Sequence, residues 1–328
     1  MMEEMIIFDL EQGQSLGKQI ADHMNIYLGE YEFRRFEGGE HKIRPLVNVR
    51  NRDVFVISSL YGDRMDSVND KLCRLFFFLG ALRDATAGRI TVVAPYLCYS
   101  RKDRKTKARD PVTTKYLARL FDAMKIDAIM TMDVHNLQAF QNSYHCLTEH
   151  LEAKNLFVKY FAHKLRGESI LVMSPDFGGA KRAEQFRESL EKELKNEIGF
   201  GLMEKSRSKG IVKGDKVTGE LEGKSIILID DLIGSGGTLL RAAEACQQRG
   251  AKAIYAVATH GTFSQDAQHN LDQPAFEEIV ITDSIPHLNL DPTFVQKKIH
   301  VISISTLLAK AILCMHTGDS IVELLGHE

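Results

Sequence analysis

The sequence lacks the usual features of a secreted, membrane-spanning or nucleic-acid-binding protein. Its five cysteines are scattered and form no C-x-x-C pair, so we expect a reducing compartment, without a disulfide framework or a zinc site. No apolar run approaches the length of about 18 residues that a membrane span needs, and the acidic start predicts a first strand rather than a signal peptide. The formal net charge of −2 gives no bulk attraction to nucleic acid or to a membrane. We therefore expect a cytoplasmic enzyme or regulator.

Short apolar runs alternate with amphipathic helical segments along all 328 residues. Near-continuous Val/Ile/Leu strands between helices predict parallel sheets covered on both faces. The alternation restarts near residue 169, so we predict two α/β domains, each a mainly parallel sheet flanked by helices. We place them at 1–152 and 153–328, leaving open that the final helix packs back on the first domain. The predicted strands are 5–10, 53–59, 89–96, 127–133, 169–175, 225–231, 253–260, 277–283 and 298–305, and the clearest helices are 69–85, 113–125, 178–197 and 238–250.

An acid pair followed by a glycine-rich turn is the most informative motif. In "SIILIDDLIGSGGTLLRAAEA" (225–245), Asp230 and Asp231 end an apolar run and precede a helix-forming segment. Two carboxylates at a buried strand end are unfavourable unless they bind hydroxyls or cations. Small residues before a helix expose N–H groups that suit a phosphate. A sugar phosphate suits both parts of the motif, because its hydroxyls can bind to the acid pair and its phosphate to the turn. We favour this interpretation over a purely structural turn. The turn consists of Gly234, Ser235, Gly236, Gly237 and Thr238.

Two other strand ends carry candidate metal ligands. In "SPDFGGAKR" (174–182), Asp176 could hold Mg²⁺ directly or through water, because that ion prefers oxygen ligands. An Asx turn at the start of a helix is an equally good interpretation of that segment. In "TMDVHNLQ" (131–138), His135 follows a predicted strand. A lone histidine in such a place is more often structural than functional, so His135 becomes a metal ligand only if the fold brings it into the same cleft as Asp176.

Two segments are rich in cations. "YSRKDRKTKARDP" (99–111) holds six basic residues after a predicted strand, which suits a polyphosphate, although a solvated loop is the ordinary interpretation. In "MEKSRSKGIVKGDKVTGEL" (203–221), Lys205 and Arg207 alternate, so both would point the same way from an extended segment. Such a pair could neutralise a transferring phosphoryl group, and an exposed hairpin is the alternative.

Taken together, these motifs resemble the ribose-phosphate pyrophosphokinases (phosphoribosyl pyrophosphate synthetases) nearly end to end. Each marker is modest alone, whereas the ordered set at family-like spacing is highly specific. The markers are "FEGGE" (36–40), "NDKL" (69–72), "RITVVAPYLCYSRKDRK" (89–105), "TMDVH" (131–135), "SPDFGGAKR", "KSR" (205–207), "DDLIGSGGT", "ATHGTFS" (258–264) and "STLLAKAI…GDSIVELL" near the C-terminus.

The resemblance implies two phosphoribosyltransferase-like domains and a homo-oligomer, either a dimer or a hexamer. It implies transfer of the β,γ-pyrophosphoryl group of MgATP to the 1-hydroxyl of ribose 5-phosphate, with Mg²⁺ as cofactor, ATP as a substrate and AMP as the second product. The resemblance implies that Phe36 and Glu40 contact the adenine, and that Arg101, Lys102 and Asp103 make further contacts with ATP. It implies that His135 and Asp176 bind the metal and that Lys205 and Arg207 act in catalysis. It also implies that ribose 5-phosphate is bound by Asp176, Asp230, Asp231 and the 234–238 loop.

The sequence departs from the family's usual pattern at a few of these positions. Gly234 stands where a third Asp is usual, and Ser235 replaces a Thr. Gly38 replaces an Asp or Asn, and Lys102 replaces a Gln. These departures keep open a catalytically silent homologue that regulates an active synthetase. A third hypothesis is a phosphoribosyltransferase that consumes phosphoribosyl pyrophosphate. That hypothesis does not explain the first domain and its nucleotide-type loop.

Overall fold

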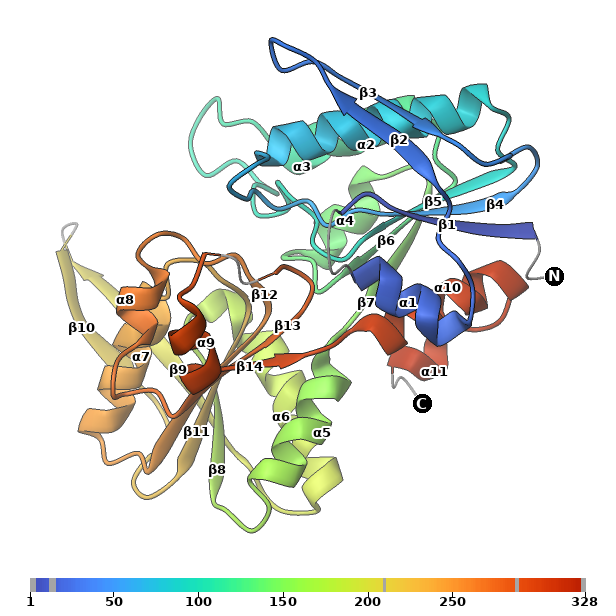
Figure 1. Ribbon diagram of the computed structural model, residues 1–328. Coiled ribbons are helices and arrows are strands. Elements are labelled where there is room, and N and C mark those ends of the chain that lie inside the picture. The colour runs from blue at the N-terminus through green and yellow to red at the C-terminus, as the bar shows by residue number, and fades with distance from the viewer. Residues whose placement is uncertain (1–3, 12–15, 209–210, 287–288, 326–328) are drawn as a thin grey trace. The chain divides into compact units, whose positions relative to one another are not determined.

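The computed structural model describes residues 4–11, 16–208, 211–286 and 289–325, with the backbone alone at 204–208, 211–216 and 325. The chain divides into two compact units, one made of 1–152 with 304–328 and the other of 153–303 (Figure 1). Within the described part, no helix is long and apolar enough to cross a membrane.

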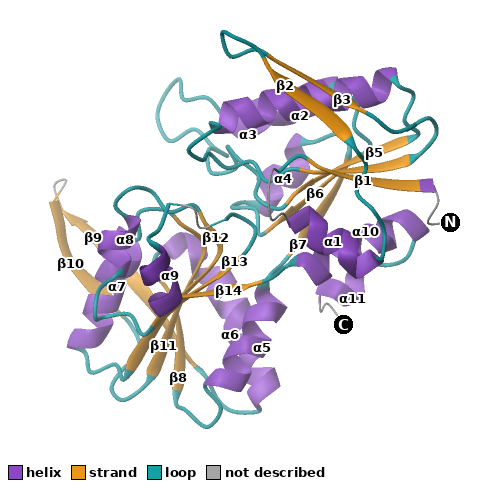
Figure 2. Ribbon diagram, viewed as in Figure 1, coloured by secondary structure: helices purple, strands orange, loops and turns teal. Residues whose placement is uncertain are grey.

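The first unit is built on a five-stranded parallel sheet with the order β1-β4-β5-β6-β7. A two-stranded antiparallel hairpin, β2–β3, packs beside helix α2 (Figure 2). The strands are β1 (Met5–Asp9), β2 (Tyr31–Arg35), β3 (His41–Pro45), β4 (Asp53–Ile57), β5 (Arg89–Ala94), β6 (Ala128–Met132) and β7 (Leu147–Leu151). The helices are α1 (Leu16–Met24), α2 (Val68–Asp84), α3 (Thr113–Ala123), α4 (Leu137–Ser143), α10 (Ser305–Thr317) and α11 (Val322–Leu325).

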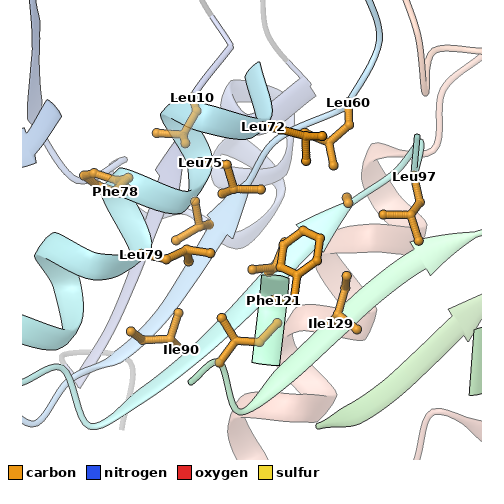
Figure 3. Close-up of a cluster of buried hydrophobic side chains, with 14 of the residues drawn as sticks. Leu10, Leu60, Leu72, Leu75, Phe78, Leu79, Ile90, Leu97, Phe121 and Ile129 are labelled. Atoms are coloured by element: carbon orange, nitrogen blue, oxygen red, sulfur yellow. The ribbon is translucent and has the colours of Figure 1, made fainter. Parts of the chain in front are cut away.

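One large hydrophobic cluster of this unit lies between its sheet and helices α2 and α3. Leu75, Phe78 and Leu79 of α2 are fully buried against the sheet residues, together with Phe121 of α3 (Figure 3). Helix α2 starts at a capping box, in which the Ser67 hydroxyl accepts from the Asp70 N–H and the Asp70 carboxylate accepts from the Ser67 N–H. Such a cap satisfies two backbone donors, so the helix begins at a defined residue.

Helix α10, near the C-terminus, belongs to the first unit and pairs with α1. The His316 imidazole bonds to Asp53 at 2.6 Å, and Arg89 donates both to that carboxylate and to the carbonyl of Met315. At the other end of α10, His23 bonds to the Ser305 hydroxyl at 3.0 Å. The chain therefore returns to its first unit after completing the second.

The second unit is built on a seven-stranded sheet with the order β10-β9-β8-β11-β12-β13-β14. All neighbours are parallel except the β9–β10 hairpin. The strands are β8 (Ile170–Ser174), β9 (Gly199–Ser208), β10 (Ile211–Val217), β11 (Ser225–Ile233), β12 (Ala253–Gly261), β13 (Glu278–Thr282) and β14 (Ile299–Ile302). The helices are α5 (Lys154–Lys164), a 3₁₀ helix (Phe177–Gly179), α6 (Ala180–Leu194), α7 (Gly237–Gln248), α8 (Ala267–Leu271) and α9 (Pro292–Lys298).

The predicted fold class is confirmed, because both main sheets are mainly parallel and flanked by helices. One detail of the acid-pair prediction was wrong: β11 continues past Asp231 to Ile233, so the carboxylates lie inside the strand rather than at its end. The strand remains regular there because Leu232 and Ile233 still pair with His260 and Gly261 of β12.

Candidate active site

The acid pair lies near the carboxyl end of β11, which runs between β8 and β12 in the second unit. Asp231 is buried, with 5% of its surface exposed, while Asp230 is partly exposed. One guanidinium nitrogen of Arg182, Nη1, contacts both carboxylates, at 3.3 Å from Asp230 Oδ1 and 3.2 Å from Asp231 Oδ1. The positive charge of Arg182 therefore offsets part of the negative charge of the two carboxylates.

The two carboxylates are electrostatically coupled. Removal from water and the neighbouring Asp231 raise the pKa of Asp230 to about 7, and the cation of Arg182 opposes that rise. The Asp230 carboxylate also accepts a bond from the backbone N–H of Asp231 at 2.8 Å. The pair therefore takes up or releases a proton near neutral pH. A ligand that donates hydroxyl hydrogen bonds would favour the ionised form.

The glycine-rich loop follows β11 directly and ends at the start of α7. Gly236 has φ of +74°, and a Cβ at this position would lie 2.9 Å from Leu271, so the turn requires glycine. Ser235 is exposed, and its hydroxyl lies 3.5 Å from the backbone nitrogen of Gly237. The side chain of Thr238 lies 3.4 Å from Arg241. Backbone donors at the start of a twelve-residue helix thus adjoin the acid pair, which is an arrangement suited to a phosphate.

Asp176 lies after β8, the strand that pairs with β11. Its carboxylate accepts from the Gly179 N–H at 3.2 Å and caps the 3₁₀ helix, as the Asx-turn interpretation expected. The Ser174 hydroxyl donates to the Asp176 carbonyl at 2.6 Å. The same turn leads into α6, which carries Arg182. The structure therefore gathers Asp176, the acid pair and the 234–238 loop at the carboxyl edge of one sheet.

In the first unit, the basic loop and the His135 segment meet. Asn136 follows His135, caps α4 and donates to the Asp103 carboxylate at 2.6 Å. His135 and Arg101 are both exposed. Lys102 bonds within its own loop, to Asp110 at 2.7 Å, and this bond lowers the pKa of the Asp110 carboxyl. Two predicted site segments thus share one edge of this sheet.

The predicted adenine segment forms the tip of the β2–β3 hairpin. Phe36 is 41% exposed, its N–H donates to the Glu40 carbonyl at 2.8 Å, and the guanidinium of Arg34 lies 5.2 Å from its ring. Gly38 and Gly39 have φ of +88° and +89°, with open space where side chains would begin. The tip is therefore a tight turn that presents one aromatic ring to solvent.

An ion cluster that sequence analysis missed fixes this hairpin. Asp66, 8% exposed, bonds to Arg35 of β2 at 2.5 Å and also to Arg74 of α2. Both guanidinium groups lie over the Phe33 ring, at 5.5 and 4.4 Å. Nearby, Asn69 accepts from Tyr99 at the start of the basic loop, at 2.6 Å. The amino end of α2 thus anchors both segments predicted to bind ATP.

Lys205 and Arg207 lie on β9, whose backbone pairs them with Asp215 and Val212 of β10. Their side chains lie outside the described residues. Among the side chains that are described, no three His, Cys, Asp or Glu groups gather into a metal cage. Mg²⁺ is commonly held by one or two carboxylates, substrate phosphates and water, so Asp176 suits it without a cage. The imidazole of His135 matches this hard ion less well.

The fold and the site define a phosphoribosyltransferase-like α/β protein with two units. A model for the N-terminal domain of ribose phosphate pyrophosphokinase matches residues 5–124, and one for the phosphoribosyl synthetase-associated domain matches 202–326. The ribose-phosphate pyrophosphokinase of Fusobacterium nucleatum is 37% identical over 98% of both chains. That of Caldanaerobacter subterraneus is 38% identical over 97% of this chain and 96% of its own. The chain belongs to the ribose-phosphate pyrophosphokinase family, as the motifs predicted.

A solved structure agrees with this assignment. The phosphoribosylpyrophosphate synthetase from Mycobacterium smegmatis is similar with a TM-score of 0.86 and 28% identity, covering 96% of this chain and 99% of its own. The likeness therefore extends over both units rather than over one domain.

Proposed function

We propose that this protein is a ribose-phosphate diphosphokinase, which transfers the β,γ-pyrophosphoryl group of ATP to the 1-hydroxyl of ribose 5-phosphate. The products are phosphoribosyl pyrophosphate, which serves nucleotide biosynthesis, and AMP. The observation that carries the proposal is the acid pair adjoining a phosphate-type loop at one sheet edge, in a chain 37% identical to a ribose-phosphate pyrophosphokinase over nearly its whole length.

Ribose 5-phosphate binds to the second unit in this proposal. The carboxylates of Asp230 and Asp231 accept hydrogen bonds from the sugar hydroxyls, and the backbone N–H groups of 234–238 donate to the 5-phosphate. Both contacts are local to the end of β11, so the sugar is held at its two ends. Asp176 lies on the adjoining strand end and completes the acidic side of the site.

ATP binds through the first unit. Phe36 and Glu40 contact the adenine from the hairpin tip, and Arg101 and Asp103 act from the loop after β5. The Lys102 ammonium already bonds to Asp110 at 2.7 Å and to the Thr106 hydroxyl at 3.0 Å. Its third N–H is left to donate to the nucleotide, while the other two hold the loop in shape. Charge neutralisation and positioning supply most of the catalysis of such transfers, so these contacts matter for rate as well as affinity.

Asp176 would hold Mg²⁺, which when bound supplies charge neutralisation to the phosphates. The family resemblance implies His135 as a further metal ligand. The 1-hydroxyl oxygen forms a bond to the β-phosphorus, and the bond from that phosphorus to the α,β-bridging oxygen breaks, leaving AMP. The hydroxyl proton is released to water. Lys205 and Arg207 stabilise the negative charge that develops on the transferred group. No residue is assigned as a general base.

We further propose that the protein works in the cytoplasm as a homo-oligomer, a dimer or a hexamer. The scattered cysteines support a reducing compartment. The family membership supports self-association, which size-exclusion chromatography with light scattering would measure.

The test is an AMP-release assay with ATP, Mg²⁺ and ribose 5-phosphate. AMP formation that depends on the sugar phosphate, and not on unphosphorylated ribose, supports the proposal. AMP no higher than in the control without sugar contradicts it. Binding of ribose 5-phosphate without turnover would point instead to the silent regulatory homologue.

A further inference from the structure

The segment after β12, residues 262–271, packs against the predicted phosphate loop, residues 234–238. The Ser264 N–H donates to the Gly234 carbonyl at 3.2 Å, and the Asn270 side-chain amide donates to the Ser235 carbonyl at 2.8 Å. Leu271 closes the space behind Gly236. Two successive carbonyl groups of the loop therefore point toward this one segment.

The direction of those carbonyl groups determines the direction of the loop's N–H groups. In a trans peptide the C=O and the following N–H point in opposite directions, and both peptides are trans. With the Gly234 and Ser235 carbonyls turned toward 264–270, the N–H groups of Ser235 and Gly236 point to the other side. Among the described residues, neither of these donors has a protein acceptor. They are thus oriented for an external anion.

We propose that Asn270 is a positioning residue for the 5-phosphate, because its amide sets the orientation of the Ser235–Gly236 peptide and so aims the Gly236 N–H at the phosphate. The inference rests on the proposed function, since it names the support of the same sugar-phosphate site. Asn270 does not touch the sugar phosphate itself; it acts through the loop.

The anchoring of α8 does not depend on Asn270. Ala267 and Leu271 are fully buried in the core of the second unit, and the Gln268 side chain accepts from the Asp291 N–H at 2.8 Å. The bond from Asn270 to the loop is exposed and is a single side-chain contact. Its removal should leave the helix in place and free the Ser235 carbonyl to rotate.

The chain offers a matched control just after this segment. The side-chain amide of Gln273 donates to the His269 carbonyl at 2.8 Å, a bond of the same chemistry that stays within one turn of the chain. Gln273→Ala therefore removes an equivalent hydrogen bond without touching the loop. Asn270→Gln keeps the donor and serves as the rescue variant.

The experiment measures ribose 5-phosphate binding by calorimetry and steady-state kinetics for wild type, Asn270→Ala, Asn270→Gln and Gln273→Ala. We expect Asn270→Ala to raise the Kd and KM for ribose 5-phosphate about five- to tenfold, the size of one lost hydrogen bond. Its KM for ATP and its melting temperature should match those of Gln273→Ala, and Asn270→Gln should recover part of the affinity.

The outcomes separate this inference from the proposed function. Equal affinities for Asn270→Ala and Gln273→Ala overturn the positioning role and leave the transfer reaction standing. A wild type that releases no AMP, yet binds ribose 5-phosphate in a way that Asn270→Ala weakens, overturns the reaction and keeps the positioning role. A wild type that does not bind ribose 5-phosphate overturns both.

Discussion

Nη1 of Arg182 lies 3.2 Å from Oδ1 of Asp231, and the same nitrogen lies 3.3 Å from Oδ1 of Asp230. A helix that begins after the Asp176 turn thus supplies a single cation to two adjacent carboxylates of β11. Without it, two neighbouring negative charges would be held together with little compensation. Arg182 and the acid pair are therefore one electrostatic unit.

Replacing Arg182 should shift the titration of the site. Because the Arg182 cation lowers the pKa of Asp230, Arg182→Ala should raise that pKa further, and the pair should then hold its proton to higher pH. We expect the acidic limb of the pH profile of kcat/KM for ribose 5-phosphate to move toward higher pH. Lys181→Ala, which removes the exposed neighbouring cation, is the control. An unshifted limb would separate Arg182 from the acid pair.

The raised pKa of Asp230 also predicts how stability depends on pH. The ordinary pKa of an Asp is near 3.9, and burial beside Asp231 raises the pKa of Asp230 to about 7 in the folded protein, so folding favours its protonated form. The associated stabilisation is complete below about pH 4 and is lost as the pH rises through 7. Asp230→Asn should therefore raise the melting temperature relative to wild type by about 2–4 °C at pH 8, and less at pH 5. Calorimetry without ligand measures both, and an equal change at the two pH values contradicts the shift.

The position of Gly234 can accept the carboxylate that the family usually has there. A Cβ at this position would lie 3.7 Å from Leu232 and 3.9 Å from Thr262, which are ordinary contact distances. We expect Gly234→Asp to fold normally and to lower the KM for ribose 5-phosphate by about five- to tenfold, as one added charged hydrogen bond would. Gly236→Ala is the contrasting variant, because its positive φ and the 2.9 Å approach of Leu271 should disrupt the loop. An unchanged KM in Gly234→Asp would show that the usual carboxylate does not act on the sugar here.

Asp66 should matter for both stability and nucleotide binding. Its removal leaves the buried Arg74 without its carboxylate partner and releases Arg35, so Asp66→Ala should reduce the free energy of unfolding by about 3 kcal/mol. Because the hairpin tip then loses its anchor, the KM for ATP should rise while the KM for ribose 5-phosphate stays unchanged. Denaturant unfolding and steady-state kinetics measure the two effects. Glu32→Ala removes two exposed ion pairs of the same hairpin, with Lys42 and Arg44, and should change neither quantity.

Lys205 tests the catalytic assignment that comes from the family resemblance. Lys205→Ala should lower kcat by roughly 10²–10³ while ribose 5-phosphate still binds, as expected for the loss of a transition-state contact. Single-turnover kinetics with a parallel binding measurement would show this. Near-normal turnover would remove Lys205 from the mechanism.

Contiguous patterns made most of the fold predictable from the sequence. The buried strands of both sheets are continuous apolar runs, and β11 is an example. The β2–β3 hairpin was missed because "YEFRR" and "HKIRP" are half exposed and polar, and they become strands only where α2 covers one face. Strand β7, "LTEHL", was missed because it is likewise polar and partly exposed.

The same limit applies to the candidate site. The acid pair and its loop could be predicted together because they are adjacent in the chain. The contact of Arg182 with Asp231 joins residues 49 positions apart, and that of Asn270 with Ser235 joins residues 35 apart. No local pattern encodes such pairs, because strand order and helix packing create them. The bond between Lys102 and Asp110 joins residues only eight positions apart, but a run of charges does not show which of them pair.

The most direct measurement of the central claim is phosphorus NMR of the reaction of this protein with ATP, Mg²⁺ and ribose 5-phosphate. We expect AMP and a new sugar-linked diphosphate in equal amounts, the diphosphate being seen as two coupled phosphorus signals. Formation of ADP with a single new sugar phosphate signal, or no change beyond slow ATP hydrolysis, would contradict it.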